Sequence, residues 1–140
     1  TTFNLGTILD HARQQAYLTK KTKITLTDER QDPFVSYSFY FEGGVSSYVR
    51  HINRNRTPLN DPPIFIEKEN NGIAIEVAFS YTDDYNEHVF CFANNILTAE
   101  GGTHLTGFRS ALTRVLNDYV KKINAKIGEN GLQFFKESLF

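Results

Sequence analysis

Three basic residues, Arg109, Arg114 and Lys121, have the spacing best suited to chemistry with a charged ligand. They fall within one stretch of helical apolar periodicity. Arg114 and Lys121 are seven residues apart and therefore share one face of the helix. Cations in this arrangement can follow the phosphates of a nucleic acid. The same pattern also fits a solvated helix face, with Arg109 half-buried beside the apolar stripe.

The other chemically capable side chains indicate neither a catalytic residue nor a metal site. The four histidines lie at no metal-ligand spacing, and Cys91 is the one cysteine of the chain. The paired carboxylates Asp83 and Asp84 fall in a predicted turn, where such pairs are usually solvated turn-formers. A second basic group consists of Arg50, Arg54 and Arg56. We therefore predict no catalytic residue and no metal ligand.

The run Glu100-Gly101-Gly102-Thr103-His104 opens the helix that carries the first basic group, and a similar Glu-Gly-Gly occurs at residues 42–44. Free N–H groups at a helix start can hold an anion. Because no basic side chain accompanies either turn in the sequence, we favour the alternative that the glycines supply backbone freedom. His104 would then donate to a neighbouring loop, or cap and pack the first turn.

Hydrophobic periodicity predicts how these residues are positioned. It favours helices over residues 5–17, 45–52 and 103–123, and strands over residues 23–27, 34–41, 64–68, 73–81 and 88–93. The run Asn70-Asn71-Gly72 is a strong hairpin signal. Strands mixed with three helices predict an α+β fold, with a mainly antiparallel sheet and helices packed on one face.

Length and composition predict one domain over residues 1–140, because 140 residues suffice for one core but not for two ordinary ones. Apolar runs fall short of the ~20 residues that span a bilayer, so we expect no membrane contact. The lone Cys91 suggests a reducing, cytoplasmic setting. The net charge of −1 does not indicate a nucleic-acid binder by itself. A chain that lacks Met and starts in a helical pattern is expected to be part of a longer protein.

Several segments resemble the transducer domain of the ATPase subunit of bacterial type II DNA topoisomerases, that is, the B subunit of DNA gyrase and its topoisomerase IV counterpart. The strongest is Glu100–Asn117. The others are Phe41-Glu42-Gly43-Gly44-Val45, Asn53-Arg54-Asn55-Arg56-Thr57-Pro58, Ile75-Glu76-Val77-Ala78 and Cys91-Phe92-Ala93-Asn94-Asn95-Ile96. The resemblance covers nearly the whole chain and implies a ribosomal protein S5 domain 2-like fold.

The resemblance also implies a role for this segment. The parent protein would use ATP and Mg, bound in a preceding ATPase domain of its own chain, to pass one DNA duplex through another with the help of a cleavage subunit like gyrase A. The transducer relays nucleotide state, and Arg109 would sense the transported double-stranded DNA. The family's Gln-Thr-Lys loop is missing, and residues 134–140 do not match its continuation. We therefore expect the isolated chain to bind no cofactor, hydrolyse no ATP and cut no DNA.

Two other assignments stay open. One is a non-enzymatic nucleic-acid-binding module that shares only the S5-like architecture, and which would bind DNA or RNA in a salt-sensitive way. The other is the corresponding domain of a mismatch-repair ATPase or a related chaperone, against which the run from Glu100 to Arg109 argues. The sequence does not separate gyrase from topoisomerase IV.

Overall fold

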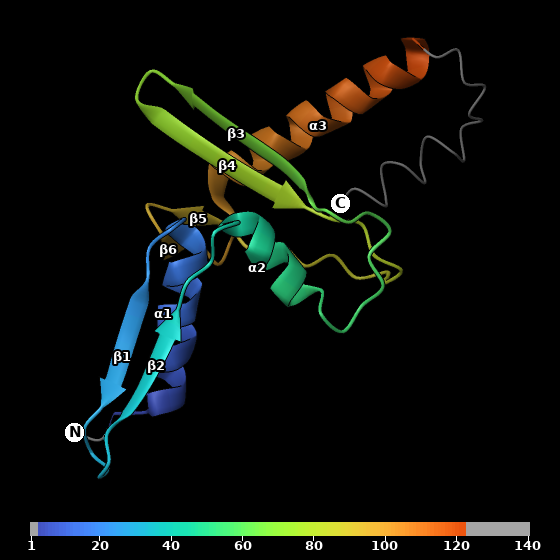
Figure 1. Ribbon diagram of the computed structural model, residues 1–140. Coiled ribbons are helices and arrows are strands. Elements are labelled where there is room, and N and C mark those ends of the chain that lie inside the picture. Colours follow the sequence, from blue (N-terminus) through green and yellow to red (C-terminus); the bar gives the residue numbers. More distant parts are fainter. Residues whose placement is uncertain (1–2, 123–140) are drawn as a thin grey trace. The chain divides into compact units, whose positions relative to one another are not determined.

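The computed structural model describes residues 3–122, and Figure 1 shows its helices and strands. Their bounds are α1 Leu5–Leu18, β1 Ile24–Asp28, β2 Val35–Phe39, α2 Val45–Ile52, β3 Ile64–Asn70, β4 Ile73–Phe79, β5 Phe92–Ala93, β6 Ile96–Leu97 and α3 Gly102–Lys122. The described strands form three two-stranded antiparallel sheets, β1–β2, β3–β4 and β5–β6. The predicted α+β class with antiparallel pairing is confirmed.

The chain divides into two compact units, Thr1–Asp84 and Tyr85–Phe140. The first unit holds α1, α2 and the sheets β1–β2 and β3–β4, and the second holds β5–β6 and α3. Within residues 3–122, no helix is both long enough and apolar enough to cross a membrane. The part of the predicted third helix at Ile123 and the non-matching tail lie outside the described residues.

The helix α1 begins where the sequence predicts. The Asn4 side chain accepts a hydrogen bond from the Thr7 N–H at 3.2 Å and so caps the first turn. At the other end, the Thr19 hydroxyl donates to the Gln15 carbonyl at 2.7 Å. Near this end, Tyr17 is 4% exposed and stacks on Phe41, with ring centroids 3.7 Å apart. This aromatic contact is the centre of the buried core of the first unit.

The strands β1 and β2 alternate as half-buried strands do. Their inward positions pair Ile24 with Phe39 and Leu26 with Tyr37. The outward positions carry Thr and Ser, and their hydroxyls meet across the strands at 3.0 Å in the pairs Thr25–Ser38 and Thr27–Ser36. The sheet contacts α1, and the Arg13 guanidinium of α1 lies 5.2 Å from the centroid of the inward Phe39 ring. The predicted strand over residues 34–41 is therefore correct in type but shorter.

Asp28 ends β1 in a local ion pair with Arg30. The Arg30 Nε donates to Oδ1 at 2.8 Å and Nη2 donates to Oδ2 at 2.7 Å, while the Arg30 N–H donates to Oδ1 at 3.1 Å. This two-pronged contact, with the Asp28 side chain 4% exposed, is the strong geometry for an arginine and a carboxylate. The Arg30 hydrogen bonds lower the pKa of Asp28 to about 2.

Replacing Asp28 with asparagine is expected to make the free energy of unfolding depend less steeply on pH in the acidic range. A carboxyl with a lowered pKa in the folded state is protonated more readily when unfolded, so its contribution is present above its ordinary pKa of 3.8 and is lost as pH falls toward about 2. Urea unfolding at a series of acidic pH values measures this slope. The variant Asp32→Asn, which changes an exposed loop carboxylate, should keep the wild-type slope. An unchanged slope in Asp28→Asn would contradict the assignment.

The hairpin β3–β4 turns at Asn71 and Gly72, whose φ angles of 52° and 76° are those of the predicted tight hairpin turn. Lys20 ties the hairpin to the rest of the first unit. Its Nζ lies 2.9 Å from Glu67 and 3.3 Å from Glu76, and 4.7 Å from the Phe65 ring centroid. The sequence did not predict this contact, because Lys20 and Glu67 are 47 residues apart.

The predicted strand over residues 88–93 is largely wrong. Residues 88–91 are not in a strand, and only Phe92–Ala93 pairs, with Ile96–Leu97. Asn94 and Asn95 form the turn between them with φ angles of 49° and 64°. Asparagine tolerates this left-handed region better than most residues. The chain therefore reverses at Asn94 and Asn95, directly after the residue at which the predicted strand ends.

Candidate functional site

The start of α3 is shaped by the glycines of the Glu100–His104 run. The N–H of Gly101 donates to the Thr98 carbonyl at 3.0 Å, and Gly101 has a φ of 81°. A Cβ at Gly101 would lie 2.6 Å from the Leu105 Cδ2 atom, so the Leu105 side chain would have to shift, and the positive φ strains any residue other than glycine. These observations support the interpretation that the glycines supply backbone freedom.

His104 connects the first turn of α3 to the segment that follows β6. Its Nε2 lies 3.5 Å from the Thr98 hydroxyl. That hydroxyl and the Thr98 N–H donate to the Cys91 carbonyl at 3.0 and 2.8 Å. Thr103 and Glu100 are exposed beside this contact. Within the described part of the chain, the contacts of the Glu100–His104 run hold the first turn of α3 in place, which is a structural role.

Arg109 lies in the second turn of α3 and forms an ion pair with Glu87. Its Nη2 donates to Glu87 Oε1, and the two side chains are 36% and 38% exposed. The half-burial matches the predicted place of Arg109 beside the apolar stripe. Burial raises the pKa of the Cys91 thiol. The charge of Arg109 lowers this pKa and the charge of Glu87 raises it, each to a smaller extent than burial. The ion pair therefore lies near Cys91, on the segment that precedes β5.

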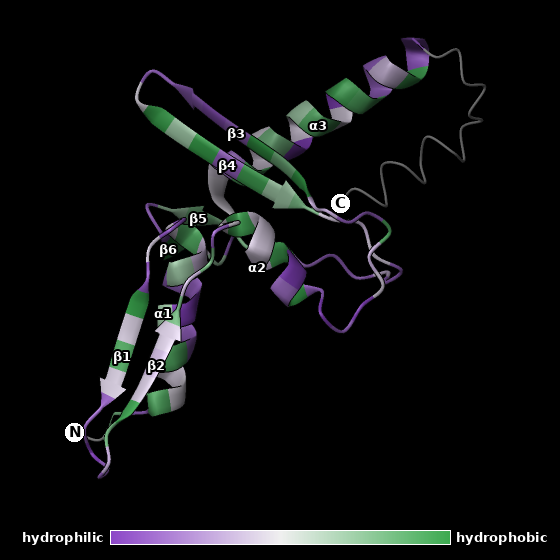
Figure 2. Cartoon of the chain, in the orientation of Figure 1, coloured by the Kyte–Doolittle hydropathy of each residue, from purple (hydrophilic) through white to green (hydrophobic). Residues whose placement is uncertain are grey.

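The other two predicted DNA-contacting residues, Arg114 and Lys121, are exposed on α3. They share one face, whereas Arg109 lies five residues before Arg114 and so about 140° around the helix. The exposed Asp118 falls one turn after Arg114 and lowers the positive charge of that face. Figure 2 shows hydrophilic and hydrophobic bands alternating along α3. The structure thus brings Arg114 and Lys121 together but leaves Arg109 on a different face.

The apolar stripe of α3 is only partly covered. Four of its members are half-buried, namely Leu105, Phe108, Leu112 and Leu116. Val115 and Tyr119 are 59% and 60% exposed. The helix therefore presents apolar as well as basic side chains at its surface, and periodicity alone did not distinguish the covered positions from the exposed ones.

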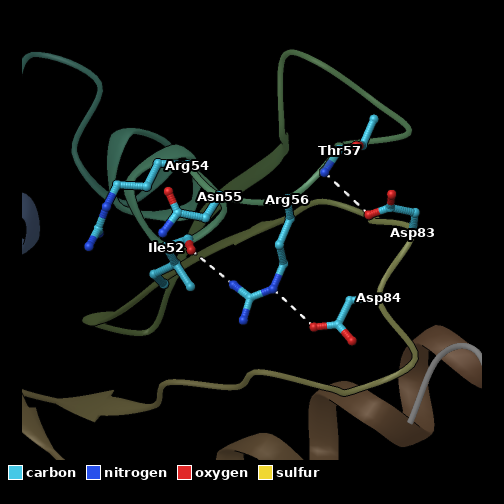
Figure 3. Close-up of a pocket in the computed structure, with 7 residues that line it drawn as sticks. All are labelled: Ile52, Arg54, Asn55, Arg56, Thr57, Asp83 and Asp84. Atoms are coloured by element: carbon cyan, nitrogen blue, oxygen red, sulfur yellow. Dashed lines mark hydrogen bonds and ion pairs between the residues drawn. The ribbon is translucent and has the colours of Figure 1, made fainter.

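A polar hollow of about 530 Å³ lies beside the end of α2 in the first unit (Figure 3). Arg56 crosses it. Its Nε donates to Asp84 Oδ2 at 3.0 Å and its Nη1 donates to the Ile52 carbonyl at 2.9 Å. Asp83 Oδ1 accepts from the Thr57 N–H at 3.2 Å. Asp83 is exposed at a bend, as predicted, whereas Asp84 is half-buried in its ion pair with Arg56, and both aspartates hold the loop after α2.

The second basic group does not gather into one cationic surface. Arg50 pairs with Asp61 at 2.9 Å, and Arg56 pairs with Asp84. Arg54 points away from Arg56 in Figure 3, and its Nη1 donates to the His51 carbonyl at 3.1 Å. Burial lowers the pKa of His51, and the charge of Arg54 adds to this effect.

The hollow does not suit a nucleotide or its metal ion. Two arginines and two aspartates line it, so its formal charge is balanced. Among residues 3–122, no three His, Cys, Asp or Glu side chains gather as metal ligands would. At Gly44, which precedes α2, a Cβ would lie 2.5 Å from the Lys20 Cγ atom, so the Lys20 stem fills the space at that helix start. This hollow and this helix start therefore do not offer ATP and Mg a fitting site.

Comparisons of the sequence with known proteins point to one family. The family model for DNA gyrase B matches residues 44–138. The DNA gyrase B subunit of Clostridium acetobutylicum is 47% identical over 123 residues, which are 87% of this chain and 19% of that protein. A DNA gyrase B subunit of Bacillus mycoides is 41% identical over 124 residues, covering 89% of this chain and 30% of the relative. The chain thus spans about a third or less of the length of these relatives.

Solved structures show the same likeness. The 43K ATPase domain of Thermus thermophilus gyrase B, solved with an aminocoumarin, matches with a TM-score of 0.79 and 33% identity over 89% of this chain and 33% of that one. The B-subunit of DNA gyrase from Myxococcus xanthus also gives a TM-score of 0.79, at 19% identity over 86% of this chain and 34% of that one. These neighbours are consistent with the S5-like fold that the sequence predicts.

Proposed function

The chain belongs to the DNA gyrase B family, and we propose that it is the transducer segment of a type II DNA topoisomerase. In this role it couples ATP binding and hydrolysis in a neighbouring domain to the passage of one DNA duplex through another. The parent enzyme is then an ATP-dependent isomerase of DNA topology, and this segment contributes no catalytic residue. The proposal concerns the whole protein, of which the chain is a part.

The observation that carries the proposal is the position of Arg109 on α3. Its side chain is 36% exposed with the Nε atom buried, and it lies seven residues after Gly102, in the helix whose start the Gly101–Gly102 turn fixes. A half-exposed arginine keeps its charge and can still reach a phosphate. Arg114 and Lys121 add two exposed cations farther along the helix. These three residues are the candidate contacts with duplex DNA.

ATP and Mg have their place in the parent protein outside this segment. The charge-balanced hollow beside α2 and the filled space at Gly44 favour a nucleotide site elsewhere. The expected partners are the ATPase domain of the same chain, a cleavage subunit like gyrase A, and double-stranded DNA. With these partners, we expect the protein to act in the cytoplasm.

The DNA contact of α3 is tested by the salt dependence of binding. In the parent protein, the double substitution Arg114→Gln and Lys121→Gln is expected to weaken binding of a linear duplex and to lower the slope of log affinity against log salt by about 2, because each lost phosphate contact lowers it by about 1. Fluorescence anisotropy over a range of salt concentrations measures this slope.

The control replaces two exposed lysines of the first unit, Lys23→Gln and Lys68→Gln, which remove the same charge. This variant should keep the wild-type slope. If both double variants change the slope equally, the effect of Arg114 and Lys121 is one of net charge and α3 is not the DNA contact. The isolated chain is expected to turn over no ATP with or without DNA.

A further inference from the structure

We propose that Glu87 is a built-in competitor of DNA for Arg109, so that a DNA phosphate must displace this carboxylate before Arg109 can sense it. The inference rests on the proposed function, because it assigns a regulatory residue to the same DNA-sensing site. It concerns the second unit alone, since Glu87 and Arg109 both lie in Tyr85–Phe140.

The geometry of the pair supports competition. The Arg109 Nη2 donates a charge-assisted hydrogen bond to Glu87 Oε1. A phosphate oxygen can accept the same kind of hydrogen bond in place of the carboxylate. Both side chains are between one-third and two-fifths exposed, with the Arg109 Nε atom buried, so a ligand from solvent can reach the exposed part of the Arg109 side chain without unfolding the segment. Glu87 is not part of a regular element, and the nearest strand, β5, begins at Phe92. The carboxylate can therefore move away while α3 stays in place.

The balance of energies makes the exchange reversible. A partly exposed ion pair contributes little to stability, and solvent and salt weaken it. A duplex offers a dense row of phosphates, and binding them releases counterions. Glu87 therefore holds Arg109 when no DNA is present, and yields to a duplex that lies along α3. This arrangement raises the DNA concentration needed for a response.

The test uses the full-length protein that contains this segment. ATP turnover is measured against the concentration of a linear duplex for wild type and for Glu87→Gln, which keeps size and loses charge. We expect Glu87→Gln to lower the duplex concentration for half-maximal stimulation about two- to fivefold. The matched control Glu69→Gln removes an exposed glutamate of β3 and should leave this concentration unchanged.

The two single variants Arg109→Gln and Glu87→Gln together separate this inference from the proposed function. If Arg109→Gln removes the DNA response while Glu87→Gln leaves the midpoint unchanged or raises it, Glu87 does not compete and the inference fails alone. If Arg109→Gln leaves the DNA response intact, the proposed function fails, and the inference fails with it.

Discussion

Replacing Tyr17 with alanine is expected to lower the free energy of unfolding by about 3–5 kcal/mol, the range seen when a large buried aromatic is truncated. Tyr17 is 4% exposed. Its ring stacks on Phe41 at 3.7 Å and lies 5.1 Å from the Tyr48 ring. Truncation leaves a cavity where α1 and α2 meet the segment after β2. Urea unfolding monitored by circular dichroism measures the change.

Two matched variants sharpen this prediction. Tyr17→Phe keeps the stacked ring, so its free energy of unfolding should stay within about 1.5 kcal/mol of wild type. Tyr85 is fully exposed, and Tyr85→Ala should change the free energy of unfolding by less than about 0.5 kcal/mol. A loss below about 1 kcal/mol for Tyr17→Ala would show that this aromatic cluster is not the core of the first unit.

Local signals in the sequence predicted most of the regular elements. The helix over residues 45–52 has its predicted bounds, and Asn71-Gly72 forms the expected turn. These features depend on periodicity and on turn chemistry, which neighbouring residues determine. The predicted strand over residues 88–93 failed because its apolar composition gave no information about a pairing partner. The dipeptide Asn94-Asn95, directly after this segment, carried a turn signal that could have indicated the reversal.

The contacts that define the site could not be predicted in the same way. Arg109 and Glu87 are 22 residues apart, and Arg56 and Asp84 are 28 apart. Such pairs depend on how elements pack against one another in space. Helical or strand periodicity describes a single element and carries no information about contacts between elements. The pairing of Arg56 with Asp84 does follow from one further fact. Pro58 bridges Thr82 in an antiparallel sense, and two more steps outward in this register place Arg56 opposite Asp84.

Replacing Arg109 with glutamine in the parent protein is expected to remove the stimulation of ATP turnover by DNA. Glutamine keeps a polar side chain but loses the charge that attracts a phosphate. A coupling between two sites is typically worth about 1–3 kcal/mol, so its loss is measurable as a several-fold change in the ratio of turnover with DNA to turnover without it. Arg109→Lys keeps the charge but loses the planar fork, and should retain part of the response.

The control for this variant is Arg50→Gln. Arg50 also pairs with a carboxylate, Asp61, and its side chain is 58% exposed on α2 in the first unit. It should respond to DNA like wild type. Circular dichroism of both variants establishes that a lost response does not come from a lost fold.

The central claim is that this segment transmits the presence of DNA to the ATPase through Arg109. Its most direct test is the ratio of ATP turnover with and without linear duplex DNA, measured on the parent protein for wild type, Arg109→Gln and Arg50→Gln. The account predicts a ratio well above one for wild type and Arg50→Gln, and a ratio near one for Arg109→Gln. A folded Arg109→Gln variant that DNA stimulates as strongly as wild type would contradict it.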